Sequence, residues 1–425
     1  MGIGKKPPAS ALDAAQRIRS YVHFDTPLSK KACAALVTDP LRVERHAFLP
    51  FLRHDVVRAR LKRLPGGRVI KSSKIRDIRY AAHSDAAIYS YYNFLLSQRY
   101  EALLAGYALT NNVIAFRALA KSNVDFAQEA FNWISGELPC VAMGFDVKDF
   151  FGSLDHHLLK TAWAELLDCE RLPPDHFSVF KSLTRHASVE LISARRELGL
   201  SRSSLSRIDR LCGAPEFRSV IRSKGLIETN KKNRGIPQGS PISAALSNIY
   251  MWRFDLRLRD EVEKFGGFYR RYCDDILLVL PQSEGVESSF TTLVEHELRA
   301  LRLQLQSSKT LVCHFSAAGN DKPLNYLGLV FNGTSVGLRV AGVARFYQKM
   351  RKGVGQLKGS KRLDGKTPIL IQRRRLLTNR YTEHVSPGDR SYFSYVKLAA
   401  NRTRSVAIRR QLRLHRARFK ALSRD

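Results

Sequence analysis

Residues 268–280, FYRRYCDDILLVL, place two adjacent aspartates, Asp274 and Asp275, between two largely apolar segments. Aromatic residues before the pair and an aliphatic run after it predict two strands joined by a tight turn, with the carboxylates at its tip. Two ionised carboxylates side by side repel each other, and a bound cation relieves this repulsion. The stretch therefore predicts a metal-binding antiparallel hairpin, although an Asp-Asp pair taken alone is more often a solvated turn.

A second carboxylate site lies upstream, in GFDVKDFF at residues 144–151. Apolar residues precede Asp146 and an aromatic pair follows it, so we expect Asp146 to end a buried strand; an ordinary turn-capping aspartate is the alternative. With the Asp pair, Asp146 would bind two Mg²⁺ ions about 3.5–4 Å apart, an arrangement that supports phosphoryl transfer. We assign catalysis to Asp146, Asp274 and Asp275, and metal binding to Asp146, Val147, Asp274 and Asp275.

A glycine-rich loop lies between the two carboxylate sites, in RGIPQGSPIS at residues 234–243. Two glycines and two prolines predict a loop, and the spacing of the apolar residues that follow predicts a helix with one buried face. A glycine loop that enters a helix lets the backbone approach a bound nucleotide closely. Gln238 and Gly239 are therefore candidates for nucleotide binding.

At this point the chain resembles a reverse transcriptase, over roughly residues 63–335. The Asp146 segment is similar to the first catalytic motif of that family, RGIPQGSP to its nucleotide-binding loop, and YCDD to its second catalytic motif. The resemblance implies an α+β right-hand polymerase fold, with fingers, an antiparallel-sheet palm packed on helices, and an α-helical thumb. It also implies dNTP substrates and two Mg²⁺ ions per active site, with Mn²⁺ as a substitute.

The resemblance adds further binding residues. The dNTP-binding set is Lys71, Lys74, Arg76, Phe151, Gln238, Gly239 and Lys309, and the primer grip is Tyr326, Leu327 and Gly328. Asp85 follows the basic fingers residues and is included with them. The guanidinium of Arg76 suits bidentate phosphate binding. The proline and glycines that are usual around the family's fingers lysine are absent here, which leaves open whether Lys71 or Lys74 touches the triphosphate; a solvated charged face is the alternative for both.

Phe151 bears on the choice of sugar. It stands five residues after Asp146, where the resemblance places a bulky side chain under the sugar, and an aromatic ring there would clash with a ribose 2′-hydroxyl. This favours deoxynucleotides and fits an RNA-dependent RNA polymerase less well. The alternative is that Phe151 belongs to an ordinary core pair with Phe150.

The charge of the chain independently predicts a nucleic-acid partner. The net charge is +33, from 71 Lys and Arg against 38 Asp and Glu, and residues 341–425 hold 23 basic and 4 acidic residues. Apolar and aromatic residues interleave with the basic runs, which predicts helices with one packed face and one phosphate-facing face. The nucleic-acid-binding candidates in this region are Arg373, Arg374, Arg375, Arg409, Arg410 and Arg413.

The remaining patterns predict one polymerase module in four parts. The parts are a helical basic N-terminal extension (1–62), fingers (63–135), a palm (136–334) with a helical insertion at about 156–230, and a basic α-helical thumb (335–425). We expect the insertion to pack between fingers and palm and to contact RNA; a plain structural insertion is the alternative. Six scattered cysteines lack metal-site spacing and favour a reducing, cytoplasmic location, and no segment has the length of a membrane span.

The biological role rests on resemblance alone. The palm is similar to those of bacterial group II intron, retron and defence-associated reverse transcriptases. The single-module length, the basic N-terminal extension and the YCDD variant most resemble a defence-associated enzyme of type 2. That group implies antiphage immunity and a structured non-coding partner RNA that is copied into cDNA. A retron or intron-type enzyme and an inactive RNA-binding protein with a polymerase fold are the alternatives, and the oligomeric state is open.

Overall fold

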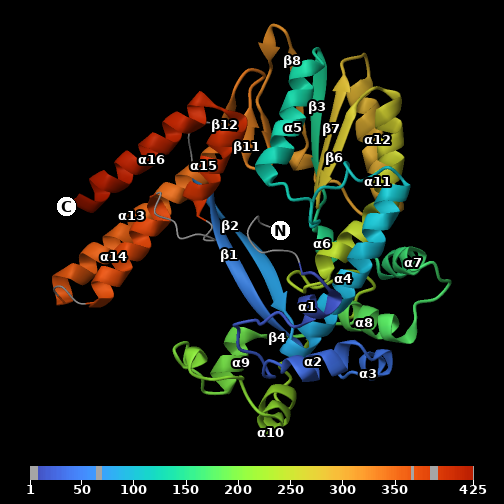
Figure 1. The fold of residues 1–425 in the computed structure, drawn as a ribbon, viewed down its shortest axis with the longest axis vertical. Coiled ribbons are helices and arrows are strands. Elements are labelled where there is room, and N and C mark those ends of the chain that lie inside the picture. The colour runs from blue at the N-terminus through green and yellow to red at the C-terminus, as the bar shows by residue number, and fades with distance from the viewer. Residues whose placement is uncertain (1–7, 64–68, 365–367, 383–390, 425) are drawn as a thin grey trace.

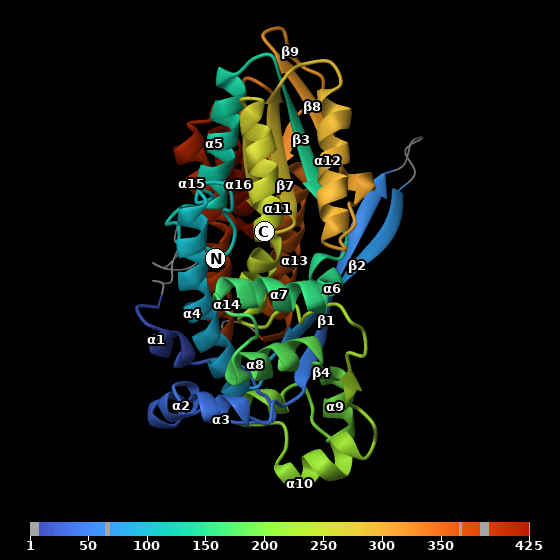
Figure 2. The same ribbon diagram turned by 90° about the vertical axis from the view of Figure 1, so that its right-hand side faces the viewer.

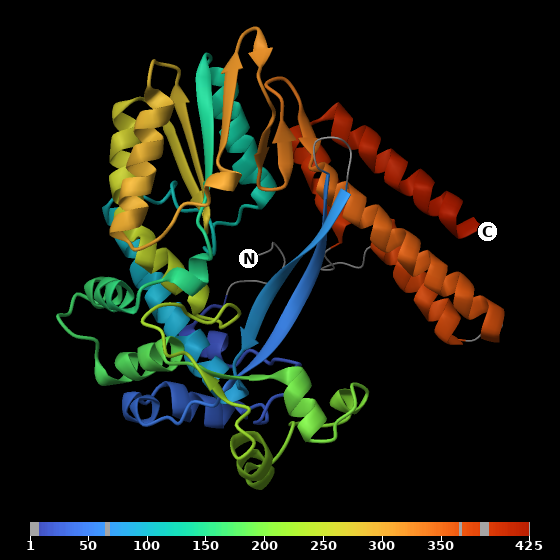
Figure 3. The same ribbon diagram turned by 180° about the vertical axis from the view of Figure 1, so that it is seen from behind.

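The computed structural model describes residues 8–63, 69–364, 368–382 and 391–424, without the side chains of 58–63, 69–72, 74, 359–364, 368–371, 373 and 424. A palm built on a five-stranded sheet stands above the fingers, and a group of thumb helices leans away from the palm (Figure 1). The long β1–β2 hairpin rises between them, as the view from behind shows clearly (Figure 3). The predicted α+β class with an antiparallel palm sheet is confirmed.

The palm sheet carries the two catalytic motifs at one edge. Its strands, in spatial order, are β6 (Phe268–Tyr272), β7 (Asp275–Pro281), β3 (Cys140–Asp146), β8 (Leu311–Ser316) and β9 (Gly319–Asn320). All four neighbouring pairs are antiparallel. The hairpin predicted for residues 268–280 and the strand predicted to end at Asp146 are therefore confirmed.

Both faces of the palm sheet are buried, because the period-two alternation of a strand sends successive side chains to opposite sides. In β3, Val141 and Met143 pack with helices α11 (Ser243–Lys264) and α12 (Val286–Ala300). Ala142 packs in a second core with helix α5 (Asn123–Gly136). The helix predicted after the glycine loop is α11. In the side view, α5, α11 and α12 run along the sheet (Figure 2).

Helix α5 lies almost entirely within the predicted fingers, which end at residue 135, but it packs against the palm sheet. Its buried residues Phe131 and Ile134 share one core with Cys140 and Phe315 of the palm sheet. The helix is amphipathic, and periodicity shows that it has an apolar face without showing which sheet covers that face. Helix α5 therefore belongs spatially to the palm.

The fingers sheet contains a second correction. The chain begins with short helices α1 (Ala11–Ala15), α2 (Lys30–Val37) and α3 (Pro40–Glu44), followed by strands β1 (Phe51–Arg63) and β2 (Val69–Tyr80). The prediction of a helical extension over 1–62 is thus wrong from Phe51 onward. Twelve of the thirteen residues of β1 pair with β2 in a long antiparallel hairpin, which no helical segment could do.

The region at about 156–230, predicted from the sequence to be a helical insertion, contains mostly helices, and two of its strands complete the fingers sheet. It contains α7 (His156–Leu166), α8 (Pro174–Thr184), β4 (Ala187–Glu190), α9 (Leu191–Glu197), η1 (Ser204–Ser206), α10 (Ala214–Glu216), η2 (Phe217–Arg222) and β5 (Glu228–Thr229). Strand β4 pairs in parallel with β1, where Leu52 lies opposite Val189. Both side chains are fully buried, so this segment supports the base of the β1–β2 hairpin.

A small sheet connects the palm to the thumb. Its strands are β10 (Leu324–Tyr326), β11 (Leu329–Phe331) and β12 (Val336–Leu338). The thumb helices are α13 (Val340–Asp364), α14 (Pro368–Tyr381), α15 (Tyr392–Thr403) and α16 (Val406–Arg424). The core formed by α5 and the palm sheet also includes Val396 of α15 and Ile408 of α16. The base of the thumb is therefore fixed to the palm by apolar packing.

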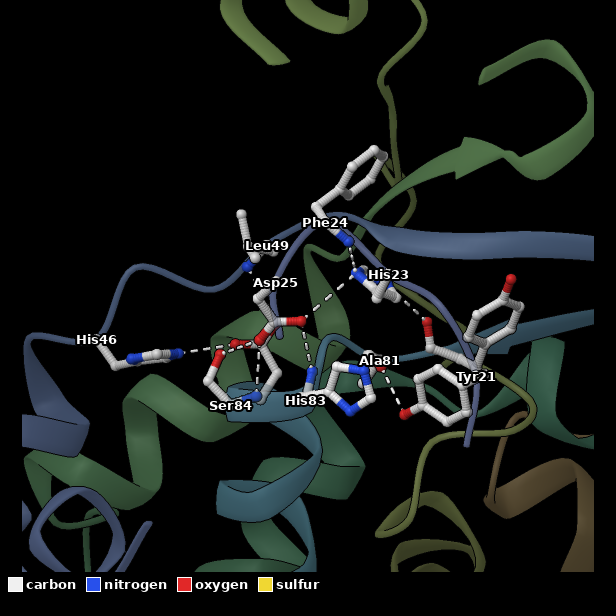
Figure 4. A network of polar contacts seen from close by, with 11 residues as sticks. Tyr21, His23, Phe24, Asp25, His46, Leu49, Ala81, His83 and Ser84 are labelled. Atoms are coloured by element: carbon white, nitrogen blue, oxygen red, sulfur yellow. Dashed lines mark hydrogen bonds and ion pairs between the residues drawn. The ribbon is translucent and has the colours of Figure 1, made fainter. Parts of the chain in front are cut away.

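A network of polar contacts joins the N-terminal segment to the first turn of α4 (His83–Gly106) (Figure 4). Helix α4 lacks a capping side chain of its own, and Asp25 accepts hydrogen bonds from the backbone N–H groups of His83 at 2.8 Å and Ser84 at 2.9 Å. Asp85 is buried and accepts a hydrogen bond from His46 at 2.7 Å. The N-terminal segment thus supplies the cap that α4 needs.

We predict that Asp25→Ala lowers the free energy of unfolding by about 1–2 kcal/mol, the usual loss for an N-cap. Amide hydrogen exchange at residues 83–86 should accelerate in the same variant, because the first turn of α4 loses its acceptor. The matched control is Asp39→Ala, which removes the cap of the five-residue helix α3 at the surface. Equal exchange at residues 83–86 in the Asp25 variant and the native protein would contradict the capping role.

Candidate active site

The first and second carboxylate sites meet at one edge of the palm sheet. Asp146 at the end of β3 lies directly opposite Asp275 at the start of β7 in the strand register. The N–H of Val147 donates to the carbonyl of Asp274 at 3.3 Å, so the chain continues the pairing past the end of β3. The structure thus brings together Asp146, Val147, Asp274 and Asp275, four residues drawn from two distant parts of the sequence.

Like charge is concentrated at this edge. The pKa of Asp275 is raised to about 6, first because the surrounding protein desolvates its carboxyl group and then because Asp274 and Asp146 are negative. The residue itself retains solvent contact. Lys309 opposes this charge, because its ammonium group pairs with the Asp146 carboxylate. The nearby Arg339 acts in the same direction. Excess negative charge in reach of solvent is the condition that a cation relieves.

The donor set suits a hard divalent ion. Carboxylate oxygens are the ligands that Mg²⁺ prefers, and Asp146 and Asp275 would hold the ion with Asp274 beside them. Across the part of the chain that the structure describes, no three His, Cys, Asp or Glu side chains converge as a ready-made metal cluster. The ammonium group of Lys309 is paired with the Asp146 carboxylate in this structure.

The turn that carries the Asp pair is tight and internally packed. Cys273 adopts a left-handed backbone conformation, with φ of 61°, and its side chain is 7% exposed. Burial and the neighbouring Asp274 raise the pKa of the Cys273 thiol, which keeps it protonated. Cys273 is therefore a packing residue and not a nucleophile.

The glycine loop lies against the fingers strand β2. The N–H of Arg79 donates to the carbonyl of Gln238 at 2.8 Å. Gly239 has a φ of +118°, and a Cβ at that position would lie 2.6 Å from the carbonyl oxygen of Arg79. Only glycine permits this approach. The contact therefore fixes the spacing between the glycine loop and β2, the fingers strand that carries Arg76.

The same loop holds the segment that follows Asp146. The N–H of Ile236 donates to the carbonyl of Phe151 at 2.9 Å, and the N–H of Gly235 to that of Leu154 at 2.8 Å. Phe150 is buried in the core, whereas Phe151 is half-buried, with the two ring centroids 5.6 Å apart. The two phenylalanines thus have different environments, and Phe151 is the more exposed of the two.

A family model described as "Reverse transcriptase (RNA-dependent DNA polymerase)" matches residues 96–331, more than half of the chain. The chain belongs to the reverse transcriptase family. A search of curated proteins finds no match.

Solved structures similar to this reverse transcriptase include apo telomerase from Candida tropicalis, truncated from its C-terminal domain. The identity is 11%, with a TM-score of 0.43, over 73% of this chain and 61% of that one. Another is telomerase from Candida albicans in complex with a TWJ fragment of telomeric RNA, at 13% identity and a TM-score of 0.41 over 86% and 61% of the two chains. The chain therefore spans less than two thirds of either telomerase chain.

The fingers residues of this reverse transcriptase are only partly placed. Arg76 is half-buried on β2, and in the described part of the chain it pairs with no carboxylate. Lys71 and Lys74 lie outside the residues whose side chains the structure describes. The grouping of Asp85 with these residues is wrong, because Asp85 is 1% exposed and binds His46 and the N–H of Leu49.

The residues predicted to grip the primer form a strained turn between palm and thumb. Leu327 has a φ of 45° and Gly328 a φ of 94°. A Cβ on Gly328 would lie 2.9 Å from the hydroxyl of Tyr395 in α15. Tyr326 is buried, and both tyrosine hydroxyls are buried without a hydrogen-bond partner among the described residues. The turn is therefore packed directly against the thumb.

The predicted basic thumb residues lie on exposed helix surfaces. Arg374 and Arg375 of α14 and Arg409, Arg410 and Arg413 of α16 are exposed, and the side chain of Arg373 lies outside the described set. Helix α16 buries Ile408 and Phe419 on its opposite side. The expected division of α16 into a packed face and a basic face is present. No described helix is long and apolar enough to cross a membrane.

Two arginines of the site were missed from the sequence. Arg339 lies near Asp275 but follows the primer-grip segment by eleven residues, so local sequence carries no signal for it. Arg271 is fully buried just before the catalytic turn. An arginine on the inward-facing side of a buried strand is a signal that could have been noticed.

We predict that Asp275→Asn stabilises the metal-free protein near pH 7.5. The pKa of the Asp275 carboxyl is about 6 in the folded state, above its ordinary value of 3.8, so the folded state binds the carboxyl proton more tightly than the unfolded state does. The free energy of unfolding of the native protein therefore falls as the pH rises from about 4 through 6. With a chelator present, the variant should melt a few degrees higher at pH 7.5 and equal the native protein at pH 4.

Added Mg²⁺ should raise the melting temperature of the native protein and leave the variant almost unchanged, because the variant lacks one ligand. The exposed Asp209, changed to Asn, serves as the control. A difference in melting temperature between Asp275→Asn and the native protein that is the same at pH 4 and pH 7.5 would contradict the assigned electrostatics.

Proposed function

We propose that this protein is an RNA-directed DNA polymerase that copies a structured RNA into cDNA by two-ion nucleotidyl transfer. The observation that carries the proposal is the pairing of Asp146 opposite Asp275 across β3 and β7, with Asp274 beside them and Lys309 on Asp146. Opposed carboxylates next to a lysine provide ligands for divalent ions and a cation for phosphate. Membership of the reverse transcriptase family supports the same chemistry.

The divalent ions would activate the primer 3′-hydroxyl and neutralise charge on the triphosphate. The other tasks fall to side chains and backbone of this chain. Lys309 would release the Asp146 carboxylate and face the departing pyrophosphate with its ammonium group. Gln238 and Gly239, fixed to β2, would position the incoming nucleotide. Arg76, Lys71 and Lys74 are assigned to its phosphates, and Phe151 to the face of the sugar.

The thumb would hold the template and product. Exposed arginines of α14 and α16, together with Arg373, would contact phosphate oxygens, while the Tyr326, Leu327 and Gly328 turn would hold the primer end. Phosphate contacts release counterions, so RNA affinity should fall steeply with salt. The partners are a structured non-coding RNA, its cDNA and dNTPs.

The proposed biological role is antiphage defence in the cytoplasm, in the manner of defence-associated reverse transcriptases, type 2 among them. All six cysteines are free, which suits a reducing compartment. A retron-type or intron-type enzyme is the second candidate. Sequencing the RNA and DNA that copurify with the protein distinguishes them, because a single neighbouring RNA and its complement would identify the template.

We predict that Asp274→Ala combined with Asp275→Ala abolishes DNA synthesis and phage protection while RNA binding stays nearly unchanged. The change removes the ion ligands and also removes negative charge, which does not weaken attraction to phosphate. Extension of primed RNA with dNTPs or NTPs in Mg²⁺, and gel shifts on the same RNA, measure both properties. Loss of RNA binding by the folded double variant would contradict the assignment of Asp274 and Asp275 to catalysis. If the native protein makes no product with either dNTPs or NTPs, that result would support an inactive RNA-binding protein.

We predict that Phe151→Ala raises incorporation of ribonucleotides relative to deoxynucleotides by about 10- to 100-fold, the range expected when a steric block is removed. The ratio of kcat/KM for dNTP and NTP measures the effect. Phe150→Leu is the matched control, since Phe150 is buried in the core and should not alter sugar choice. An unchanged ratio in Phe151→Ala would mean that Phe151 only packs.

A further inference from the structure

A buried ion pair lies directly behind the catalytic turn. Arg271 of β6 and Asp255 of α11 are both 0% exposed. The guanidinium donates from Nε to Oδ1 and from Nη2 to Oδ2 of Asp255, each at 2.6 Å, in a bidentate arrangement. Burial alone would lower the pKa of Arg271, but the Asp255 carboxylate raises it above its usual value, so the guanidinium stays charged.

The third nitrogen of the guanidinium reaches the turn itself. Nη1 of Arg271 donates to the carbonyl oxygen of Cys273 at 3.1 Å and to Oδ1 of Asn248 at 3.1 Å. Cys273 is the left-handed residue that immediately precedes Asp274. The contact therefore acts on the peptide group that joins Cys273 to Asp274 and so sets the direction in which the Asp pair leaves the turn.

The surroundings hold the guanidinium in one place. Asn248 and Asp255 are seven residues apart on α11, about two helical turns, and so lie on one face of the helix. Tyr269, two residues before Arg271 on β6, donates its hydroxyl to Oδ1 of Asp255 at 2.5 Å. The backbone of Arg271 exchanges hydrogen bonds with Asn112 at 2.8 Å and Ile114 at 3.0 Å. Contacts from α11, from Tyr269 and from the backbone of residues 112–114 thus hold Arg271 and Asp255 in place.

Stability alone is a weak reason for such a pair, because desolvation of two buried charges offsets most of their attraction and apolar side chains often serve equally well. We propose that Arg271 is a positioning residue, which holds the Cys273–Asp274 peptide in the left-handed turn and so presents Asp274 and Asp275 for ion binding. The proposal rests on the two-ion chemistry proposed above. Asp255, Asn248 and Tyr269 keep the guanidinium in place.

The test replaces the pair as a unit, with Asp255→Leu and Arg271→Met together, so that no buried charge is left without a partner. Mn²⁺ binding, measured by electron paramagnetic resonance, should weaken about 10-fold, the usual effect of losing a residue that orients a ligand. The kcat for primer extension should fall about 100-fold, because misplacing catalytic groups is costly, while KM for dNTP and RNA affinity change little. The melting temperature should stay close to that of the native protein.

The control replaces a second ion pair with a buried arginine, Arg117→Met with Glu101→Leu, in which Arg117 is 2% exposed and Glu101 45% exposed. Arg117 is bound to Glu101 and to the carbonyls of Thr110 and Val113 but does not contact the turn. Its replacement should leave Mn²⁺ affinity at the native value. If the Asp255 and Arg271 double variant fails to fold, Arg271→Lys keeps the charge but cannot form all four hydrogen bonds, and it should show the same loss of Mn²⁺ affinity.

Native Mn²⁺ affinity in a folded Asp255 and Arg271 double variant, or in Arg271→Lys, would overturn the positioning role. A fall in kcat that is matched by an equal loss in RNA affinity would overturn it as well, since that result indicates a general structural effect. Absence of Mn²⁺ binding by the native protein would instead refute the two-ion proposal, so the two failures are distinguishable.

Discussion

The antiparallel register of β3 and β7 is the constraint on which the site depends. It places Asp146 opposite Asp275, and it also sends Val141 and Met143 to one core and Ala142 to the other. A slip of one residue would exchange the two faces of β3 and separate the carboxylates. Because both faces of the sheet are buried, packing on α5, α11 and α12 enforces the same register that the chemistry needs.

The rest of the polymerase is attached to this sheet by short backbone contacts. The glycine loop binds the segment after Asp146 through Ile236 and binds the fingers strand through Gln238. The turn at Gly328 packs on Tyr395 of the thumb and receives a hydrogen bond from Arg339 at 3.3 Å. Fingers, palm and thumb therefore meet at points where glycine allows backbones or rings to approach closely. Such close contacts leave little freedom for fingers, palm and thumb to shift relative to one another.

Electrostatics at the catalytic edge has two layers. In front, the carboxylates repel one another and raise the pKa of Asp275, which favours a cation. Behind, Arg271 and Asp255 neutralise each other and add no net charge, but direct hydrogen bonds onto the turn. The front layer lowers the stability of the metal-free protein, which a bound cation would restore, whereas the back layer orients the turn. Exposed arginines of the thumb act further away, where salt screens them.

Local sequence was sufficient for the elements with a strong pattern. The hairpin around the Asp pair, the strand ending at Asp146 and the helix after RGIPQGSP were predictable, because alternation, helical periodicity and turn residues are local properties. The fingers boundaries were not. Residues from Phe51 onward form a strand that pairs with β4, more than a hundred residues later in the chain. The sequence of α5 predicts an apolar face but does not indicate which sheet that face packs against.

The sequence by itself thus determined the residue types of the site, its motif order and the uneven positive charge. Only the tertiary structure decided which carboxylates are neighbours, that Lys309 pairs with Asp146, that Asp85 is a buried structural residue, and that Arg271 reaches the carbonyl of Cys273. The physical reason is that composition and periodicity are set along the chain, whereas distances between charges depend on strand pairing and packing between distant segments.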